Sequence, residues 1–251
     1  MELLKSITGR ILIESHRGAE GLAPENSWAA IKLGHTAGAD LMELDVQLSQ
    51  DGVAFLRHHY TLPDGRLCSD VRWDELKEIR IAQEALPRLD DVLDWALEQK
   101  ICLSLDLKVG FKPEKSLATA VLRDLQHTQA WDQVMLLSWD HVELLEIKKI
   151  YPRLTTRALI YGRLAAYTDF LKHTQTDAIS LSYGIARPAD VEEIHRAGVA
   201  VIMGEMWRSD YEMIKNLGLD IFSSSDPAQD RKMLNQTFVA TNTNILSGRS
   251  Q

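Results

Sequence analysis

The stretch Leu41-Met42-Glu43-Leu44-Asp45-Val46 is the clearest of a series of short apolar runs that decide the fold class. Comparable runs predict strands at Ile11–Glu14, Ile101–Leu107, Val134–Ser138, Arg157–Tyr161, Ala178–Leu181, Ala200–Met203 and Ile221–Ser223. Most of these runs are apolar on both faces, which is typical of a parallel sheet covered by helices.

Each predicted strand is followed by a longer amphipathic stretch that predicts a helix. Asn26 and Pro113 are helix start signals. The predicted helices are Ser27–Ala37, Leu89–Gln99, Glu114–Thr128, Asp140–Ile150, Leu164–Thr174, Pro188–Ala197, Ser209–Asn216 and Ala228–Asn235. Eight β-then-α units in about 250 residues predict an α/β TIM (β/α)8 barrel. A doubly wound open sheet is the alternative, but the chain has no G-x-G-x-x-G and no Walker lysine loop.

Two segments interrupt the alternation after the second predicted strand. Gln47–Arg57 contains Asp51-Gly52, a strong β-hairpin signal, and Thr61–Pro87 forms a short irregular insertion. In a TIM barrel, additions after a strand lie at the C-terminal mouth, where active sites are built. No linker or repeat is visible, so residues 1–251 are expected to form one domain with a polar tail at about 237–251.

The composition excludes several classes of protein. The chain has 251 residues, 45% hydrophobic and 25% charged, as in an ordinary globular protein. Its net charge of −8 argues against nonspecific nucleic-acid or anionic-membrane binding, because the overall field repels phosphate. An anionic substrate would therefore need a local cationic site or a metal ion.

Cysteine usage and the N-terminus favour the cytoplasm. Cys68 and Cys102 form no C-x-x-C pair, and two thiols fit a reducing compartment. Met1–Lys5 does not begin a signal peptide, and no apolar run approaches the ~20 residues that span a bilayer. We therefore expect a cytoplasmic protein without a membrane span. The sequence leaves its oligomeric state open.

The first two predicted strands end in chemically useful side chains. His16 and Arg17 suit proton transfer and phosphate binding, or they are an ordinary loop histidine and a solvated arginine. Glu43 and Asp45 point the same way, because residues i and i+2 of a strand share a face. Two close carboxylates need a cation or a shared proton, and oxygen ligands select Mg²⁺ or Ca²⁺. A solvated strand end is the other interpretation of this pair.

The hairpin brings a second histidine toward these carboxylates. A two-residue turn at Asp51-Gly52 would place Asp45 opposite His58, with cross-strand Cα atoms ~5 Å apart. A different turn would shift the register by one residue and present His59 instead. One member of this histidine pair is expected to face the site.

The third predicted strand adds a carboxylate and a cation on one face. Asp106 and Lys108 form either an internal ion pair or, respectively, a metal ligand and a phosphate-binding group. Together the three strand ends can hold a divalent cation and a phosphate, with two imidazoles left for acid and base work.

At this point the sequence resembles the glycerophosphodiester phosphodiesterase family, of the phospholipase C-like phosphodiesterase TIM-barrel superfamily. Order and spacing agree through Lys108, and the later half matches more loosely. The matching segments are His16-Arg17-Gly18, Ala23-Pro24-Glu25-Asn26-Ser27, Glu43-Leu44-Asp45-Val46, Asp51-Gly52-Val53, His58 with Thr61-Leu62, Leu86–Leu93 and Leu105-Asp106-Leu107-Lys108.

The resemblance implies metal-dependent hydrolysis of glycerophosphodiesters to sn-glycerol 3-phosphate and an alcohol. By position it implies His16 and His58 as general acid and base, and Arg17 and Lys108 as phosphate ligands. It implies Glu43, Asp45 and Asp106 as ligands of the divalent cation, Mg²⁺ or Ca²⁺. Glu25 and Asn26 resemble the support of the first loop, although Asn26 is also a candidate helix N-cap.

Four departures from the family pattern leave details open. His59 replaces a usual aspartate, Asp106 replaces a usual glutamate, and Ser224-Ser225 replaces a threonine–aspartate pair. Ile202–Met206 replaces a tryptophan-threonine-valine-asparagine motif. Two alternatives to the hydrolase therefore remain: a related lyase that forms a cyclic phosphate, and a non-catalytic barrel that only binds phosphodiesters.

Overall fold

The computed structural model describes residues 4, 10–108, 117–182, 184–204 and 211–235. Within these residues a closed parallel barrel forms, made of β1 (Leu12–Ser15), β2 (Leu41–Leu48), β6 (Cys102–Leu107), β7 (Val134–Ser138), β8 (Thr155–Leu159), β9 (Ala178–Ser182), β10 (Ala200–Gly204) and β11 (Ile221–Ser224). Neighbouring strands pair in sequence order from β2 through β6 to β11, and β1 closes the ring by pairing with both β11 and β2. The predicted TIM barrel is confirmed.

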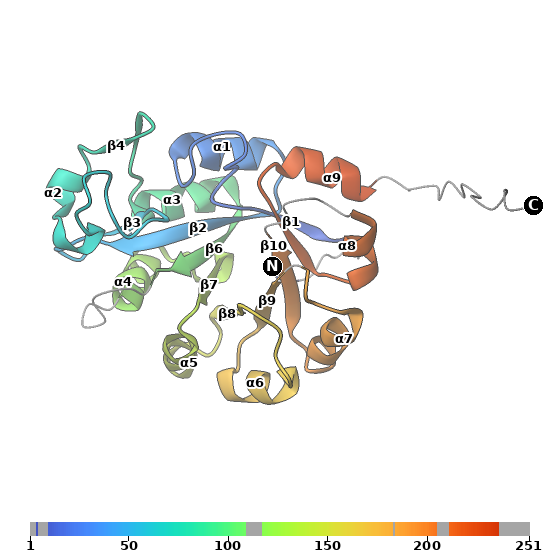
Figure 1. The fold of residues 1–251 in the computed structure, drawn as a ribbon. Coiled ribbons are helices and arrows are strands. Elements are labelled where there is room, and N and C mark those ends of the chain that lie inside the picture. The colour runs from blue at the N-terminus through green and yellow to red at the C-terminus, as the bar shows by residue number, and fades with distance from the viewer. Residues whose placement is uncertain (1–3, 5–9, 109–116, 183, 205–210, 236–251) are drawn as a thin grey trace, which may run out of the picture.

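Helices surround the barrel, each following a strand (Figure 1). They are α1 (Trp28–Thr36), α3 (Leu89–Gln99), α4 (Leu117–Thr128), α5 (His141–Ile150), α6 (Tyr167–Thr174), α7 (Pro188–Arg196), α8 (Tyr211–Leu217) and α9 (Pro227–Asn235), with a 3₁₀ turn η2 (Trp131–Gln133) before β7. The predicted helix starts at Pro113-Glu114 and Ser209, and the predicted tail at 237–251, lie outside the described residues. The expectation of a single domain over 1–251 stays a prediction.

Several element boundaries differ from the prediction by two or three residues: the end of β2, both ends of β8 and the start of α6. β8 begins at Thr155 rather than Arg157, because Thr155 and Thr156 pair with β7 although their hydroxyls make the segment look polar. Thr is β-branched and suits a strand despite its polarity. α6 begins at Tyr167 rather than Leu164.

The start of α1 corrects one expectation. The N-cap is Ser27, whose Oγ accepts a hydrogen bond from the Ala30 N–H at 3.1 Å. Asn26, the predicted cap, is buried in a left-handed conformation with φ of 56°. Asparagine tolerates that conformation, and its side chain is thereby free to contact Asp45 instead of the helix.

The hairpin register also differs from the prediction. β3 (Ala54–Leu56) pairs with β2 so that Val46 lies opposite Leu56, and the Arg57 N–H donates to the Asp45 carbonyl at 2.9 Å. Asp45 therefore faces Arg57 rather than His58. The predicted two-residue turn is wrong because Ser49 pairs with Val53, which leaves a three-residue turn that ends at Gly52 with φ of 82°.

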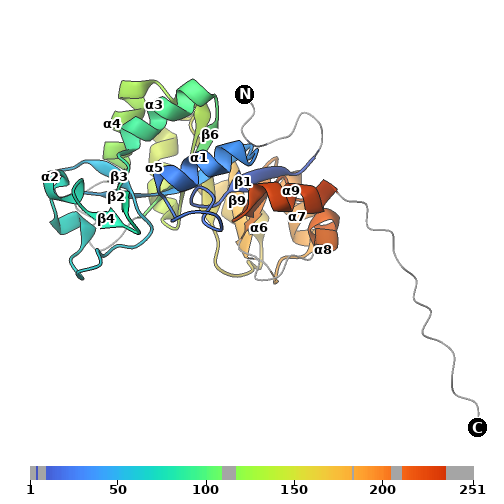
Figure 2. The same cartoon turned by 90° about the horizontal axis from the view of Figure 1, so that it is seen from above.

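The insertion after β3 builds a small subdomain beside the barrel (Figures 1 and 2). It contains η1 (Cys68–Asp70), the single-turn helix α2 (Trp73–Leu76) and a ribbon of β4 (Arg80–Ile81) with β5 (Glu84–Ala85). Its own apolar cluster consists of Phe55, Leu62, Cys68, Val71, Leu76 and Leu86. The insertion thus carries a core that anchors it to the hairpin.

Side-chain alternation divides the barrel into layers. On β2, Met42, Leu44 and Val46 point outward into the core beneath the helices. Leu41 points inward and joins an apolar plug with Cys102, Met135, Ala178, Ala200, Ile202 and Ile221. Glu43 and Asp45 point inward above that plug and line a cavity. The plug closes one end of the barrel, so chemistry is confined to the C-terminal end.

Across the described residues, no helix is both long and apolar enough to cross a bilayer.

The barrel closes at a seam that Asp40 holds together. β1 and β2 pair over only two residues, and Asp40 lies just before β2. Its carboxylate accepts hydrogen bonds from the Ile13 N–H at 2.8 Å, from Arg10 at 2.5 and 2.9 Å, and from Arg231 of α9 at 2.8 Å. Burial would raise the pKa of Asp40, but these donors outweigh it and lower the pKa.

We expect Asp40→Asn to lower the free energy of unfolding at pH 7 by roughly 1 kcal/mol. A lowered pKa stabilises the fold above the ordinary aspartate value and loses that contribution as pH falls. The difference from wild type should therefore shrink when urea denaturation is repeated near pH 3. The exposed Asp74, whose carboxylate contacts Lys77, provides the matched Asp74→Asn control. An undiminished difference at pH 3 would contradict the electrostatic explanation.

Candidate active site

A cavity of about 230 Å³ opens at the C-terminal ends of the strands. One side of it, from β1, β2, β6 and the hairpin, carries all seven residues singled out in the sequence: His16, Arg17, Glu43, Asp45, His58, Asp106 and Lys108. The other side, from β7 to β9, is largely apolar and includes Leu137, Trp139, Leu159, Ile160, Tyr161 and Leu181. The cavity thus has one charged wall and one apolar wall.

Three buried carboxylates form the centre of the charged wall. Oxygen atoms of Glu43, Asp45 and Asp106 all lie within 4.8 Å of one another. The register explains this, because Asp45 is the direct β-partner of Asp106 and Glu43 shares the face of Asp45. Burial, followed by the negative charge of Asp45, raises the pKa of Glu43 to about 8. Crowding of like charges in a dry site therefore disfavours full ionisation.

This cluster fits a divalent cation. Its donors are all carboxylate oxygens, the ligands that Mg²⁺ and Ca²⁺ prefer. Asp106 Oδ1 is buried and, within the part of the chain that the structure describes, has no hydrogen-bond partner, as expected of an atom whose natural partner is an ion. Asp106, whose side chain is one methylene shorter than the glutamate usual at this position, still brings an oxygen into the cluster.

Lys108 and Arg17 contact the same carboxylates. Lys108 Nζ donates to Asp106 Oδ2 and lies 2.7 Å from Asp45 Oδ1, so the predicted Asp106–Lys108 pair is present. Burial would lower the pKa of Lys108, but the two carboxylates raise it above its ordinary value. Arg17 lies with Nη1 2.6 Å from Glu25 Oε2 and Nε 3.4 Å from Asp45 Oδ2. Both cations stay charged at the edge of the cluster.

The first loop is shaped to deliver His16 and Arg17. Arg17 has a φ of 48°, and its N–H donates to Glu43 Oε2 at 2.9 Å. Gly18 has a φ of 75°, and a Cβ there would lie 2.8 Å from backbone atoms of Ala30 and Ile31. Only glycine therefore fits the histidine-arginine-glycine turn against α1.

Asn26 holds one of the candidate metal ligands, Asp45, through two hydrogen bonds. Its Nδ2 donates to Asp45 Oδ2 at 2.7 Å, and its Oδ1 accepts from the Asp45 N–H at 2.9 Å. This pair of bonds fixes the position of the Asp45 carboxylate. Asn26 therefore acts as a support residue in the structure, and Ser27 takes the capping role.

His16 has a partner that the sequence reasoning missed. His16 Nδ1 lies 2.5 Å from Glu20 Oε1, and that oxygen also accepts from Ser225 Oγ at 2.9 Å. Burial lowers the pKa of His16, but the Glu20 hydrogen bond and the charges of Glu43 and Glu20 raise it to about 9. The i, i+4 spacing of His16 and Glu20 was the available signal. The contact of Ser225 with Glu20 could not be predicted, because the two residues are 205 positions apart in the chain.

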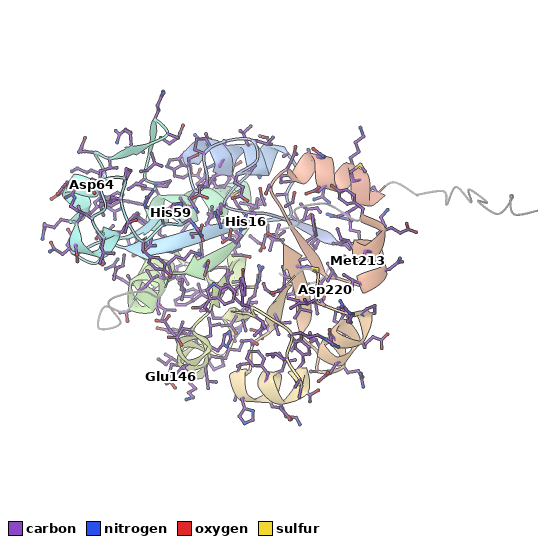
Figure 3. The ribbon with its side chains drawn as sticks, viewed as in Figure 1. His16, His59, Asp64, Glu146, Met213 and Asp220 are labelled. Carbon is purple, nitrogen blue, oxygen red and sulfur yellow. The ribbon has the colours of Figure 1, made fainter. Side chains whose placement is uncertain are left out.

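Of the two adjacent histidines, His58 faces the cavity. His58 lies past the end of β3, so its direction is not set by the hairpin register. Burial, partly offset by the charge of Asp45, lowers the pKa of His58. The His59 side chain is 65% exposed and lies farther from the barrel centre than His16 (Figure 3).

A buried ion pair that the sequence did not predict lies below the acidic cluster. Arg157 Nη1 donates to both oxygens of Glu14 at 2.8 and 2.9 Å, and its Nε donates to Ser180 Oγ at 2.6 Å. Glu14 is fully buried and Arg157 nearly so, and both line the cavity floor. The two residues are 143 positions apart, so only the closed barrel brings them together.

Sequence comparison identifies relatives of the chain. The model of the Glycerophosphoryl diester phosphodiesterase family matches residues 16–233. A glycerophosphodiester phosphodiesterase of Caldanaerobacter subterraneus is 25% identical over 231 residues, covering 87% of this chain and 95% of that protein. An uncharacterized protein of Bacillus subtilis, YqiK, is 30% identical over 159 residues, and the match spans 59% of this chain and 65% of the relative.

Solved structures share the fold. An Oleispira antarctica phosphodiesterase, in complex with the product sn-glycerol-3-phosphate, superposes with a TM-score of 0.81 at 24% identity, covering 91% of this chain and 98% of that one. A glycerophosphodiester phosphodiesterase from Parabacteroides distasonis gives 0.79 at 23% identity, covering 90% and 97%.

The fold and the charged cavity define a TIM-barrel protein of the phosphodiesterase class. The chain belongs to the glycerophosphoryl diester phosphodiesterase family, because the family match covers most of its length. The resemblance seen in the sequence is thereby confirmed, and with it the prediction that the chain belongs to an enzyme family.

The Glu14–Arg157 pair predicts a large asymmetry between single and double substitutions. Arg157→Met should cost about 3–5 kcal/mol of unfolding free energy, because it leaves the Glu14 carboxylate buried without its partner. Glu14→Leu combined with Arg157→Met should recover most of that loss. Guanidinium unfolding of the three proteins tests this. Equal losses for the single and double variants would mean that the pair does not act as a unit.

Proposed function

We propose that the protein hydrolyses glycerophosphodiesters to sn-glycerol 3-phosphate and an alcohol, with the help of a divalent cation. The observation that carries this proposal is the gathering of three buried carboxylates, two histidines and two cationic side chains on one wall of a single cavity. Family membership supports it, and so does the Oleispira antarctica structure, which holds sn-glycerol-3-phosphate in a barrel of the same fold.

The cation is proposed to be Mg²⁺ or Ca²⁺, with Glu43, Asp45 and Asp106 as its ligands. When bound, it would neutralise charge that builds up on the phosphate oxygens. Arg17 and Lys108 are proposed to hold the phosphate. Both are positively charged groups at the edge of the carboxylate cluster, and their N–H donors suit phosphate oxygens.

The environments of the two histidines favour different roles. The pKa of His16 is raised to about 9, so near pH 7 its imidazole carries a proton that it can give to the leaving alkoxide. The pKa of His58 is lowered, so its imidazole is neutral near pH 7 and can take a proton from the nucleophile. We therefore propose His16 as the general acid and His58 as the general base. The nucleophile is water or the 2-hydroxyl of the substrate glycerol.

Glu20 is proposed to position His16 for this role. Its carboxylate contacts Nδ1 of the ring, which leaves Nε2 toward the cavity, 3.9 Å from Glu43 Oε2. A carboxylate behind an imidazole fixes ring orientation and stabilises the protonated form. This arrangement resembles the support that the usual aspartate at position 59 would give to the other histidine.

Alanine substitution of either cavity histidine should abolish most turnover. We expect His16→Ala and His58→Ala each to reduce kcat for glycerophosphocholine by ~10²–10⁴-fold, since each removes a proton-transfer group. His59→Ala, at the neighbouring exposed position, is the control and should keep turnover near wild type. Phosphorus NMR of the products would separate hydrolysis from arrest at a cyclic phosphate. Wild-type rates in His58→Ala together with loss in His59→Ala would reverse the assignment of the pair.

Removal of divalent cations should stop turnover, and added Mg²⁺ or Ca²⁺ should restore it. The same treatment should leave the fold intact, because Lys108 and Arg17 still contact the carboxylates. Activity and circular dichroism after exhaustive chelation measure both effects. Glu43→Gln should bind the cation at least about tenfold more weakly. Full activity after chelation would remove the metal from the mechanism.

A further inference from the structure

A second group of metal-ligating side chains lies at the lip of the cavity. Glu25, His58 and His59 each offer one ligand atom, and these atoms lie within 4.8 Å of one another. The His58 and His59 rings are close neighbours, with centroids 4.9 Å apart and planes at 75°. No member of this group belongs to the acidic cluster, so it is a separate candidate site.

The three side chains differ in their contacts and in their exposure to solvent. Arg17 binds Glu25 through Oε2, which leaves Oε1 directed toward His59 Nε2 at 3.9 Å. His58 Nδ1 is buried and has no hydrogen-bond partner among the described residues, although buried ring nitrogens are normally satisfied. His59 lies between His16 and Asp64 of the insertion in Figure 3, and its side chain is 65% exposed.

The donor set distinguishes this group from the acidic cluster. Two borderline imidazole nitrogens together with one carboxylate oxygen suit Zn²⁺ and similar transition metals, whereas three carboxylates suit Mg²⁺ or Ca²⁺. Zn²⁺ binds histidine nitrogen and carboxylate oxygen at about 2.0–2.2 Å, which puts tetrahedral ligand atoms roughly 3.4 Å apart. The three ligand atoms, which now lie within 4.8 Å of one another, would have to close to that spacing when the ion binds.

We propose that Glu25, His58 and His59 bind a Zn²⁺-type cation, and that this binding inhibits the enzyme. The site uses three protein ligands, so a water or a substrate oxygen can take the fourth position. A ring nitrogen of His58 bonded to the metal cannot accept a proton at that atom, and the ring is fixed in place. The inhibition rests on the function proposed for His58, whereas the binding does not.

Calorimetric titration of ZnCl₂ into the full chain tests the binding directly. The titration is done with saturating MgCl₂, so that the acidic cluster is occupied by the harder ion. We expect one Zn²⁺ per chain for wild type. His59→Ala should bind at least about tenfold more weakly, because it lacks one of three ligands. His127→Ala, which removes an exposed histidine of α4, should bind as wild type does.

Turnover of glycerophosphocholine under the same conditions tests the inhibition. Zn²⁺ should inhibit wild type and His127→Ala at the concentration at which it binds, while His59→Ala should keep its basal rate and resist inhibition. Zn²⁺ affinity and inhibition that are unchanged in His59→Ala would overturn the proposal and place the effect at the acidic cluster. Zn²⁺ binding that depends on His59, in a protein that turns over no diester, would instead uphold the metal site and refute the proposed function.

Discussion

The site depends on the parallel pairing of β2 with β6, which sets Asp45 directly beside Asp106 inside the barrel. Because side chains alternate along a strand, that one register also places Glu43 and Lys108 on the inner face. Concentrating carboxylates in a buried place is unfavourable, and the structure offsets the cost with Lys108, Arg17 and a partly protonated Glu43. Each of these compensating groups is also a group that phosphodiester chemistry can use.

Local pattern was enough to predict the barrel and the charged wall, because both arise from short-range rules. Apolar runs of strand length indicated β2, β6 and β7, and i, i+2 spacing placed Glu43 with Asp45 on one face. The hairpin turn was predicted wrongly because Asp51-Gly52 fits both a two-residue and a three-residue turn. His58 still reaches the cavity, since it lies beyond the last paired residue of β3.

Contacts between distant parts of the chain could not be predicted in this way. The Glu14–Arg157 pair and the Ser225–Glu20 contact each join the first strand region to a late element, and no local spacing reports them. Asn26 shows a further limit of prediction from residue type. Its residue type suits a helix cap, and only the position of Asp45 shows that the side chain is used elsewhere.

The charge of the cavity resolves an apparent conflict in the composition. A protein with a net charge of −8 should repel a phosphate. Among the described residues that line the cavity, four acids (Glu14, Glu43, Asp45 and Asp106) face three permanent cations (Arg17, Lys108 and Arg157). The protonated His16, whose pKa is raised to about 9, and partial protonation of Glu43, whose pKa is raised to about 8, bring the cavity lining to neutrality or slightly above it at pH 7. A divalent cation would make the cavity more positive, so phosphate attraction can be local while the surface stays acidic.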